Sequence, residues 1–415
     1  MTEQAKVPAI RFAGFTDPWE QRKLGDVASS FDYGLNAAAT EYDGQNKYLR
    51  ITDIDDETHE FSKSDLTTPL ADLAMSADYL LKEGDLLFAR TGASVGKTYL
   101  YRQFDGMVYF AGFLIRARIG EGADPEFAYQ ATLTDAYKKY VAITSQRSGQ
   151  PGVNAQEYAD YQLMLPSKTE QQQIGMTLRS LDDLITLHQR KYDKLVILKK
   201  SMLEKMFPKD GESVPEIRFA GFTDPWEQRK LGDVASSFDY GLNAAATEYD
   251  GQNKYLRITD IDDETHEFSK SDLTTPLADL AMSADYLLKE GDLLFARTGA
   301  SVGKTYLYRQ FDGMVYFAGF LIRARIGEGA DPEFAYQATL TDAYKKYVAI
   351  TSQRSGQPGV NAQEYADYQL MLPSKTEQQQ IGMTLRSLDD LITLHQRKLE
   401  LLQNIKKSLL DKMFV

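Results

Sequence analysis

Apolar and polar residues alternate over short runs in the first 165 residues of the chain. The runs KYLRITDI, GDLLFARTG, KTYLYRQF and MVYFAGFLIRARIG are typical of β-strands, and turn residues separate them. One helix is predicted to interrupt the strands, with Asp124 as its N-cap, Pro125 as its first residue and FAYQATLTDAYKKYVAI as its body. The pattern therefore predicts an α+β module.

The apolar period changes to a helical one after Pro166. Ser167 and Glu170 form a capping box, and no proline follows before Met206, so one long helix is expected here. At 1.5 Å per residue this helix would be about 58 Å long.

A direct repeat organises the whole chain. Residues 10–191 and 217–398 are identical letter for letter, so the chain is one unit written twice. Such identity indicates either a recent duplication or recombination, or the deliberate joining of two copies. After this block the copies diverge, KYDKLVILKKSMLEKMF against KLELLQNIKKSLLDKMF, but the apolar spacing is the same in both.

Apolar residues recur at alternating spacings of 4 and 3 along both long helices, which predicts coiled-coil seams. The seam positions are Ile174, Leu178, Leu181, Ile185 and Leu195 in the first copy and Ile381, Leu385, Leu388, Ile392 and Leu402 in the second. Lys199 is the polar break in the first seam. We expect the two helices to pair antiparallel around a two-fold axis. The alternative is that each helix folds back on its own module.

Composition excludes several classes of protein. The chain has no cysteine, which excludes disulfides, thiol nucleophiles and most zinc sites, and it has only four histidines. Neither a membrane span nor a signal peptide is evident, so a cytoplasmic protein is expected. The net charge of −13 argues against a protein that coats nucleic acid without regard to sequence.

The stretch FARTGASVGKTYLYR at 88–102 resembles a phosphate-binding loop only superficially. A Walker A motif needs its first glycine at position 91, where this chain has Thr91, and the residues after Lys97 alternate like a strand instead of opening a helix. We therefore expect an exposed glycine-rich turn between strands, with Arg90 and Lys97 as cations that could contact DNA. The alternative is a plain hairpin turn with solvated charges.

The charges are unevenly distributed. Between positions 90 and 118 the cations Arg90, Lys97, Arg102, Arg116 and Arg118 accompany a single acid, Asp105, which predicts a local basic face. The segment SQRSGQPGVNAQ at 145–156 adds side chains suited to base edges in a major groove. In contrast, the acidic stretch DIDDETHE at 53–60 should face solvent or a basic partner.

Several motifs, each present twice, resemble one known family: WEQRKLGDVA, YGLNAAATEYDGQNKYLRITDID, GDLLFARTGASVGKT, and PSKTEQQQIGMTLRSLDDLITLHQRK leading into the KMF ending. Their order is similar to that of the specificity subunit of type I restriction–modification systems. The resemblance implies two target recognition domains at 1–166 and 209–373, each for half of a bipartite DNA site. It also implies spacer helices at 167–208 and 374–415 that pair as an antiparallel coiled coil and set the distance between the half-sites.

The resemblance also implies partners. Two methyltransferase subunits, which use S-adenosylmethionine to methylate adenine, would dock on this chain, and two restriction subunits that use ATP and Mg could join them. The chain itself would bind double-stranded DNA, carry no cofactor and catalyse no reaction. A coiled-coil scaffold without DNA specificity is the alternative function.

Family members usually carry two different recognition domains, whereas the two domains here are the same. Identical domains related by a two-fold axis would recognise identical, inverted half-sites, which predicts an interrupted palindrome. Side-chain chemistry and expected loop positions suggest as DNA contacts Tyr33, Asn36, Arg50, Arg90, Ser94, Lys97, Arg147, Gln150 and Asn154, with the copies Tyr240, Asn243, Arg257, Arg297, Ser301, Lys304, Arg354, Gln357 and Asn361.

Overall fold

Four antiparallel strands form the central sheet of each copy. The structure is a computed structural model that describes residues 7–415 except 57, 147–148, 264 and 355. The strand order is β2-β9-β6-β7 in the first copy and β12-β19-β16-β17 in the second. In both copies a two-stranded parallel pair and two antiparallel pairs accompany this sheet.

The first copy contains β1 (Glu20–Lys23), α1 (Leu24–Val27), β2 (Ala28–Tyr33), β3 (Ala39–Glu41), β4 (Lys47–Leu49), β5 (Thr67–Pro69), β6 (Asp85–Ala89), β7 (Thr98–Leu100), β8 (Val108–Phe110), β9 (Leu114–Ile119), α2 (Pro125–Ala131), α3 (Asp135–Thr144), α4 (Ala155–Ala159), β10 (Gln162–Leu165) and α5 (Lys168–Met206). The second copy contains β11 (Glu227–Lys230), α6 (Leu231–Val234), β12 (Ala235–Tyr240), β13 (Ala246–Glu248), β14 (Lys254–Leu256), β15 (Thr274–Pro276), β16 (Asp292–Ala296), β17 (Thr305–Leu307), β18 (Val315–Phe317), β19 (Leu321–Ile326), α7 (Pro332–Ala338), α8 (Asp342–Thr351), α9 (Ala362–Ala366), β20 (Gln369–Leu372) and α10 (Lys375–Met413).

The central sheet is buried on both faces. Strand β6 shows this most clearly, because Leu86 and Phe88 belong to one hydrophobic cluster and Leu87 and Ala89 to another. Successive side chains of a strand point to opposite faces, so the run Leu86–Ala89 is apolar at every position. The predicted α+β module is confirmed, and its sheet separates two cores.

The single helix predicted after Asp124 is wrong, because the chain forms two helices here. Asp124 caps α2 as expected, with its carboxylate accepting a hydrogen bond from Phe127 N at 3.1 Å. The hydroxyl of Thr132 then donates to Tyr129 O at 2.6 Å, and that of Thr134 caps α3. Threonine hydroxyls that bond to nearby backbone end one helix and begin the next.

Both long helices are present. Helix α5 begins directly after Ser167, whose hydroxyl accepts a hydrogen bond from Glu170 N at 3.4 Å, which is one half of the predicted capping box. The Glu170 carboxylate accepts two hydrogen bonds from Arg11, at 2.6 and 2.8 Å. No helix in the described ranges is long and apolar enough to cross a membrane. The expectation of a cytoplasmic location stays a prediction.

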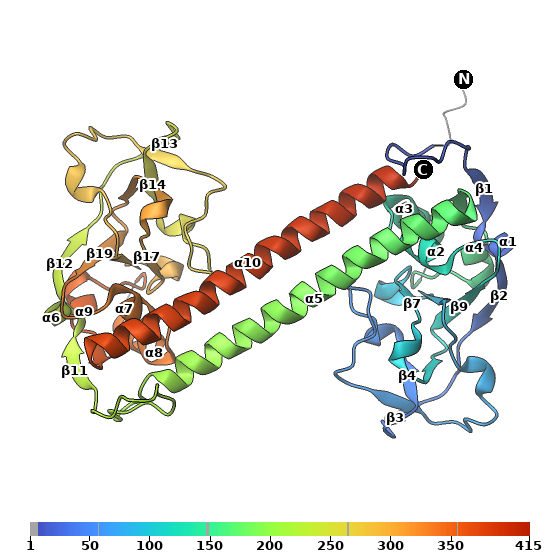
Figure 1. Ribbon diagram of the computed structural model, residues 1–415, viewed down its shortest axis with the longest axis horizontal. Coiled ribbons are helices and arrows are strands. Elements are labelled where there is room, and N and C mark those ends of the chain that lie inside the picture. Colours follow the sequence, from blue (N-terminus) through green and yellow to red (C-terminus); the bar gives the residue numbers. More distant parts are fainter. Residues whose placement is uncertain (1–6, 57, 147–148, 264, 355) are drawn as a thin grey trace. The chain divides into compact units, whose positions relative to one another are not determined.

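The chain divides into two compact units. Unit 1 runs to Gln189 and also includes Arg397–Val415, and unit 2 is Arg190–Gln396. Each unit thus contains one module and portions of both long helices (Figure 1). The predicted domain boundaries after 166, 208 and 373 follow the change of sequence pattern and stay a prediction.

Within unit 1 the portions of α5 and α10 are antiparallel. Asp182 of α5 forms an ion pair with Lys406 of α10, whereas the earlier Leu178 shares a core cluster with the later Met413. Unit 2 repeats this arrangement, with Met206 of α5 in the cluster that holds Leu385 of α10.

The predicted seam positions divide into two groups. Ile174 and Leu178 are fully buried in the core of their own module, whereas Leu181, Ile185 and Leu195 are half-buried. In the second copy Ile381 and Leu385 are buried, and Leu388, Ile392 and Leu402 are half-buried. Each long helix therefore begins in the core of its own module and then packs antiparallel with the other helix, as the pairing prediction requires, and it does not fold back on its module.

Candidate nucleic-acid interface

Three backbone segments meet at Arg90. Arg90 N donates to Phe113 O at 3.0 Å, and Val153 N donates to Arg90 O at 2.9 Å. Thr91 and Gly152 form an isolated antiparallel bridge, and Gly92 N donates to Pro151 O at 3.0 Å. The turn after β6, the turn between β8 and β9 and the segment before α4 are therefore fixed against one another.

The Arg90 guanidinium lies between two exposed aromatic rings. Its central carbon is 5.1 Å from the centre of the Tyr33 ring and 5.9 Å from that of Phe113. These rings are 45% and 56% exposed, so they are surface features and not core. The Tyr33 hydroxyl accepts a hydrogen bond from Ala155 N at 3.2 Å. The Nε atom of Arg90 is buried and has no hydrogen-bond partner among the described residues. Cation–π contacts hold a guanidinium in place and still allow its terminal N–H groups to act as donors.

Other predicted contacts lie at the same place. Asn36 follows β2 on the surface, beside Gly112 of the β8–β9 turn. Gln150 is exposed, and a Cβ added to Gly92 would lie 3.1 Å from its Nε2 atom. Ser94 lies half-exposed in the turn after Gly92. We call Tyr33, Asn36, Arg90, Phe113 and Gln150 the Arg90 surface.

Asn154 has a structural role. Its side chain accepts from Glu157 N at 2.9 Å, and Glu157 accepts from Asn154 N at 2.8 Å, which is a capping box for α4. Arg147 lies outside the described residues. Its copy Arg354 is described, and it donates to both carboxylate oxygens of Glu364 at 2.5 and 2.6 Å.

Lys97 is directed into the module. Its ammonium group donates to Ile54 O at 2.8 Å and forms an ion pair with Asp56, and the side chain is only 11% exposed. The expectation that Lys97 is a free cation in an exposed loop is therefore wrong. The turn itself is confirmed, because strand β7 and not a helix follows Lys97.

Gly96 is needed in this turn for two reasons. Its φ is +86°, a left-handed conformation that favours glycine. A Cβ there would lie 2.5 Å from a methyl carbon of Val141. The glycine thus allows the turn to pack against α3, which is a structural role.

Arg50 is also paired within the module. Its guanidinium donates to the Asp53 carboxylate at 2.9 and 2.8 Å, and the side chain is 31% exposed. Hydrogen bonding to Asp53 raises the pKa of Arg50 above its usual value. Part of the acidic stretch at 53–60 therefore serves as internal partner to cations, through Asp53 and Asp56.

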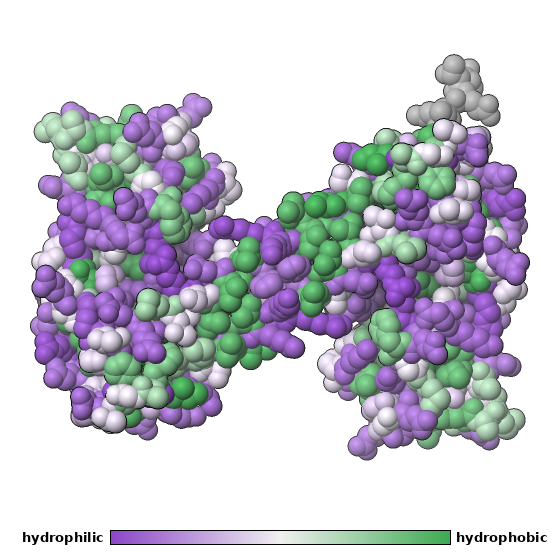
Figure 2. Space-filling view, viewed as in Figure 1, coloured by the Kyte–Doolittle hydropathy of each residue, from purple (hydrophilic) through white to green (hydrophobic). Residues whose placement is uncertain are grey.

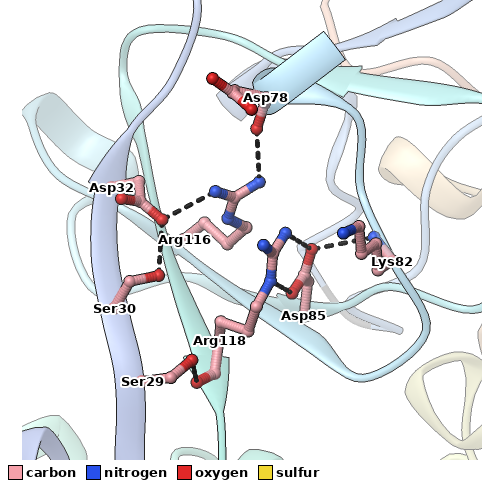
Figure 3. A network of polar contacts seen from close by, with 8 residues as sticks. All are labelled: Ser29, Ser30, Asp32, Asp78, Lys82, Asp85, Arg116 and Arg118. Carbon is pink, nitrogen blue, oxygen red and sulfur yellow. Dashed lines mark hydrogen bonds and ion pairs between the residues drawn. The ribbon is translucent and has the colours of Figure 1, made fainter.

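The predicted basic face is wrong for Lys97, Arg102, Arg116 and Arg118, because each of them has a carboxylate partner. Figure 3 shows two of these pairs. Arg116 donates to Asp32 at 2.7 Å and to Asp78 O at 2.8 Å, and Arg118 donates twice to Asp85, at 3.0 and 3.1 Å. Arg90 differs from these four, since its guanidinium forms no ion pair within the described part of the chain.

These pairs shift the pKa values of Asp32 and Arg118. Burial alone would raise the pKa of Asp32, but hydrogen bonds from Arg116 and Ser30 bring it below its ordinary value. The hydrogen bonds to Asp85 raise the pKa of Arg118. The network holds its charges inside the module, and it leaves little free positive charge for a polyanion.

Phe113 was not among the residues predicted from the sequence. The run MVYFAGFLIRARIG was predicted as strand, but it forms β8 and β9 with a turn at 111–113 between them. Gly112 was the available signal, because an isolated glycine in a strand pattern often marks a bulge or a turn.

The second module repeats the Arg90 surface. Arg297 lies 5.1 Å from the Tyr240 ring and 5.8 Å from the Phe320 ring, and Asn243 and Gln357 are exposed. The remaining copies also behave alike: Lys304 donates to Ile261 O, Arg257 pairs with Asp260, Asn361 caps α9, and Ser301 lies half-exposed.

Comparison with known proteins gives consistent matches. The family model for the type I restriction modification DNA specificity domain matches residues 16–196 and again residues 223–404. The type I restriction enzyme MjaVIII specificity subunit of Methanocaldococcus jannaschii is 21% identical over 415 residues, which cover 95% of this chain and 92% of that protein. The putative MjaX specificity subunit of the same organism is 24% identical over 225 residues, 52% of each.

A solved structure shares the fold. The S subunit of a type I restriction–modification system from M. genitalium superposes with a TM-score of 0.66 at 15% identity, and the match covers 99% of each chain.

Proposed function

The chain belongs to the type I restriction modification DNA specificity family, and on this premise we propose that each module recognises one half of an interrupted palindromic DNA site. Its function is that of a specificity subunit, the non-catalytic component that recognises DNA within a restriction–modification complex. The proposal concerns how the two modules divide that recognition.

The observation that carries this proposal is the repetition of the Arg90 surface. The block of identical sequence includes every residue of that surface, and the two guanidinium–ring arrangements agree within 0.1 Å. Identical surfaces select identical bases, and two-fold related readers select them in inverted orientation. The target is therefore a palindrome with an unspecified spacer.

We assign the central contact to Arg90 and Arg297. A guanidinium fixed between two rings can donate two parallel hydrogen bonds to O6 and N7 of guanine, the commonest specific contact in a major groove. The exposed amides of Asn36 and Gln150 are suited to the edge of adenine. Ser94 and Asn154 lie beside this surface, where they can contact phosphates.

The partners are the other subunits of a restriction–modification complex, and we propose that two methyltransferase subunits dock on the long helices. Apolar side chains remain exposed there, including Met176 (68%), Ile197 (68%), Met383 (62%) and Leu401 (59%). Figure 2 shows apolar side chains among polar ones along these helices. S-adenosylmethionine would bind to the methyltransferase subunits, and ATP and Mg to restriction subunits, where these are present.

The test is to coexpress the chain with its methyltransferase partner and to map methylated adenines across a genome by modification-sensitive sequencing. A single interrupted palindrome is the expected result. An asymmetric motif would disprove equivalent recognition by the two modules. Methylation without any sequence preference would favour the alternative of a scaffold without DNA specificity.

A further inference from the structure

A chain of polar contacts connects the first module to both long helices. Arg102 pairs with Glu126 of α2, and Gln130 Nε2 donates to Glu126 at 3.1 Å and to Asp182 of α5 at 2.8 Å. Asp182 in turn lies 2.5 Å from the ammonium group of Lys406 on α10. We call these five residues the junction network.

The junction network is largely buried. Gln130 is completely inaccessible and Glu126 is 8% exposed, and burial raises the pKa of Glu126 in spite of its arginine partner. The side chains of Asp182 and Lys406 are 30% and 17% exposed. A movement of α10 along α5 would leave Asp182 or Lys406 without its partner at a site that water reaches poorly, which is unfavourable.

The second unit contains the same network. Gln337 Nε2 donates to Glu333 at 3.1 Å and to Asp389 at 2.8 Å, and Asp389 forms an ion pair with Lys199. Lys199 is the residue that interrupts the apolar seam of the first copy. Lys199 and Lys406 occupy equivalent positions in the segments where the copies diverge, and both segments keep the lysine.

We propose that Lys199 and Lys406 set the register between α5 and α10 and so select the spacer length of the DNA site. This inference rests on the proposed function. A single lysine at a seam position specifies register at some cost in stability, because it is satisfied in one alignment only. Here that alignment is the one in which each lysine meets the aspartate already bound by a module glutamine.

A shift of register between the two helices is large compared with the length of one base-pair step. Slippage by one helical turn changes the alignment by about 5.4 Å, and one base-pair step of DNA is about 3.4 Å. The last strand of each module leads directly into the long helix whose first turns that module buries, β10 into α5 and β20 into α10. A change of register would therefore change the separation of the half-sites by more than one base pair.

The experiment replaces both lysines with an apolar residue of similar length, Lys199→Met with Lys406→Met, in the full chain coexpressed with its methyltransferase partner. Methylated sites are then sorted by spacer length. We expect unchanged half-sites, with methylation at spacers one or two base pairs longer or shorter rising at least tenfold relative to the original spacer. The matched control is Lys200→Met with Lys407→Met, because these neighbouring lysines are exposed, and it should retain a single spacer.

Two further variants guard against a simple folding defect. Lys199→Arg with Lys406→Arg keeps the charge and should retain the single spacer. Asp182→Asn with Asp389→Asn keeps a hydrogen-bonding side chain without the ion pair and should broaden the spacer range as the methionine variant does.

Methylation restricted to the original spacer in both the methionine and the asparagine variants would overturn the proposal. Loss of all methylation in both, with an unchanged circular dichroism spectrum, would also overturn it, since half-site recognition should survive. Absence of any DNA motif with the unmodified chain would instead refute the proposed function.

Discussion

Arg90 and Arg116 belong to one module and both stack on aromatic rings, yet their surroundings differ. Arg116 lies 4.9 Å from the Phe110 ring, its side chain is 5% exposed, and Asp32 neutralises it. Arg90 lies between two exposed rings and has no carboxylate partner in the part of the chain that the structure describes. Arg116 is neutralised inside the module, whereas Arg90 lies at the surface between its two rings.

Arg90 and Arg116 show that the number of charged residues in a sequence stretch does not reveal which charges lack an ion-pair partner in the fold. Arg116 and Asp32 are 84 positions apart in sequence and meet only because β9 pairs with β2. A count of charged residues near Arg116 in the sequence therefore includes the arginine but not Asp32, the aspartate that neutralises it. The useful property of Arg90 is therefore its aromatic surroundings more than its position in a basic stretch.

The largest expected effect is on stability. Replacing Arg116 and Arg323 with methionine leaves Asp32 and Asp239 without their arginine partners, and should lower the free energy of unfolding of each module by about 2–4 kcal/mol. Urea unfolding followed by circular dichroism would measure this loss. The control Arg90→Met with Arg297→Met should change stability by less than about 1 kcal/mol. Equal losses of unfolding free energy in the two variants would show that Arg90 is as important for stability as Arg116.

A smaller effect is expected on DNA discrimination. Arg90→Lys with Arg297→Lys keeps the charge but removes the planar fork of donors, which should reduce discrimination at one base pair of each half-site by about 1–3 kcal/mol. Methylation rates at sites with single substitutions would show it. The repeat offers an internal control, because Arg297→Lys alone should relax only one half-site. Unchanged discrimination in both variants would exclude base contact by this pair.

The smallest effect is on the pH dependence of stability. The pKa of Asp32 in the fold is below its ordinary value, so the unfolded chain binds this proton at higher pH than the folded chain does. The stabilisation of the fold by the Asp32 carboxylate is complete above the ordinary carboxyl pKa of about 3.9. It is lost as the pH falls through the lowered pKa of Asp32. Asp32→Asn with Asp239→Asn should flatten the fall in the urea midpoint between neutral and acid pH. An unaltered pH profile would show that the pair contributes nothing, and Arg90→Met is expected to leave the profile intact.

Much of the fold follows from sequence periodicity. The long helices, the cap at Asp124 and the strand after Lys97 depend on local patterns, and the structure agrees with them. The break between α2 and α3 was missed because Thr132 and Thr134 form hydrogen bonds that helix propensity does not describe. The short helix α4 was missed as well, although Asn154 and Glu157 form a capping box visible in the sequence.

The candidate site was predicted only in part. Arg90, Tyr33, Asn36 and Gln150 lie at the ends of strands or in turns, and the structure brings them to one surface. Their contact with DNA stays a prediction. Lys97 and Arg50 could not be distinguished from them by residue type. The partners of Lys97, Ile54 O and Asp56, are brought to it by tertiary packing, which no single-sequence pattern shows. Arg50 and Asp53 are three positions apart on a 3₁₀ turn, so their pairing had a local signal in the sequence.

The core of unit 1 includes residues from both long helices, and this has a consequence for biosynthesis. Trp19 and Phe127 pack against Phe414, with ring centres 6.4 and 5.1 Å away. In unit 2 the equivalent residue is Phe207, which packs against Trp226 and Phe334. Phe207 is synthesised before both of these partners. At about 5–20 residues per second, the first module must wait about 15–60 s after Phe127 for its last core residues. Two modules of one sequence therefore have different folding histories, and the module made first completes its core only when synthesis reaches Phe414.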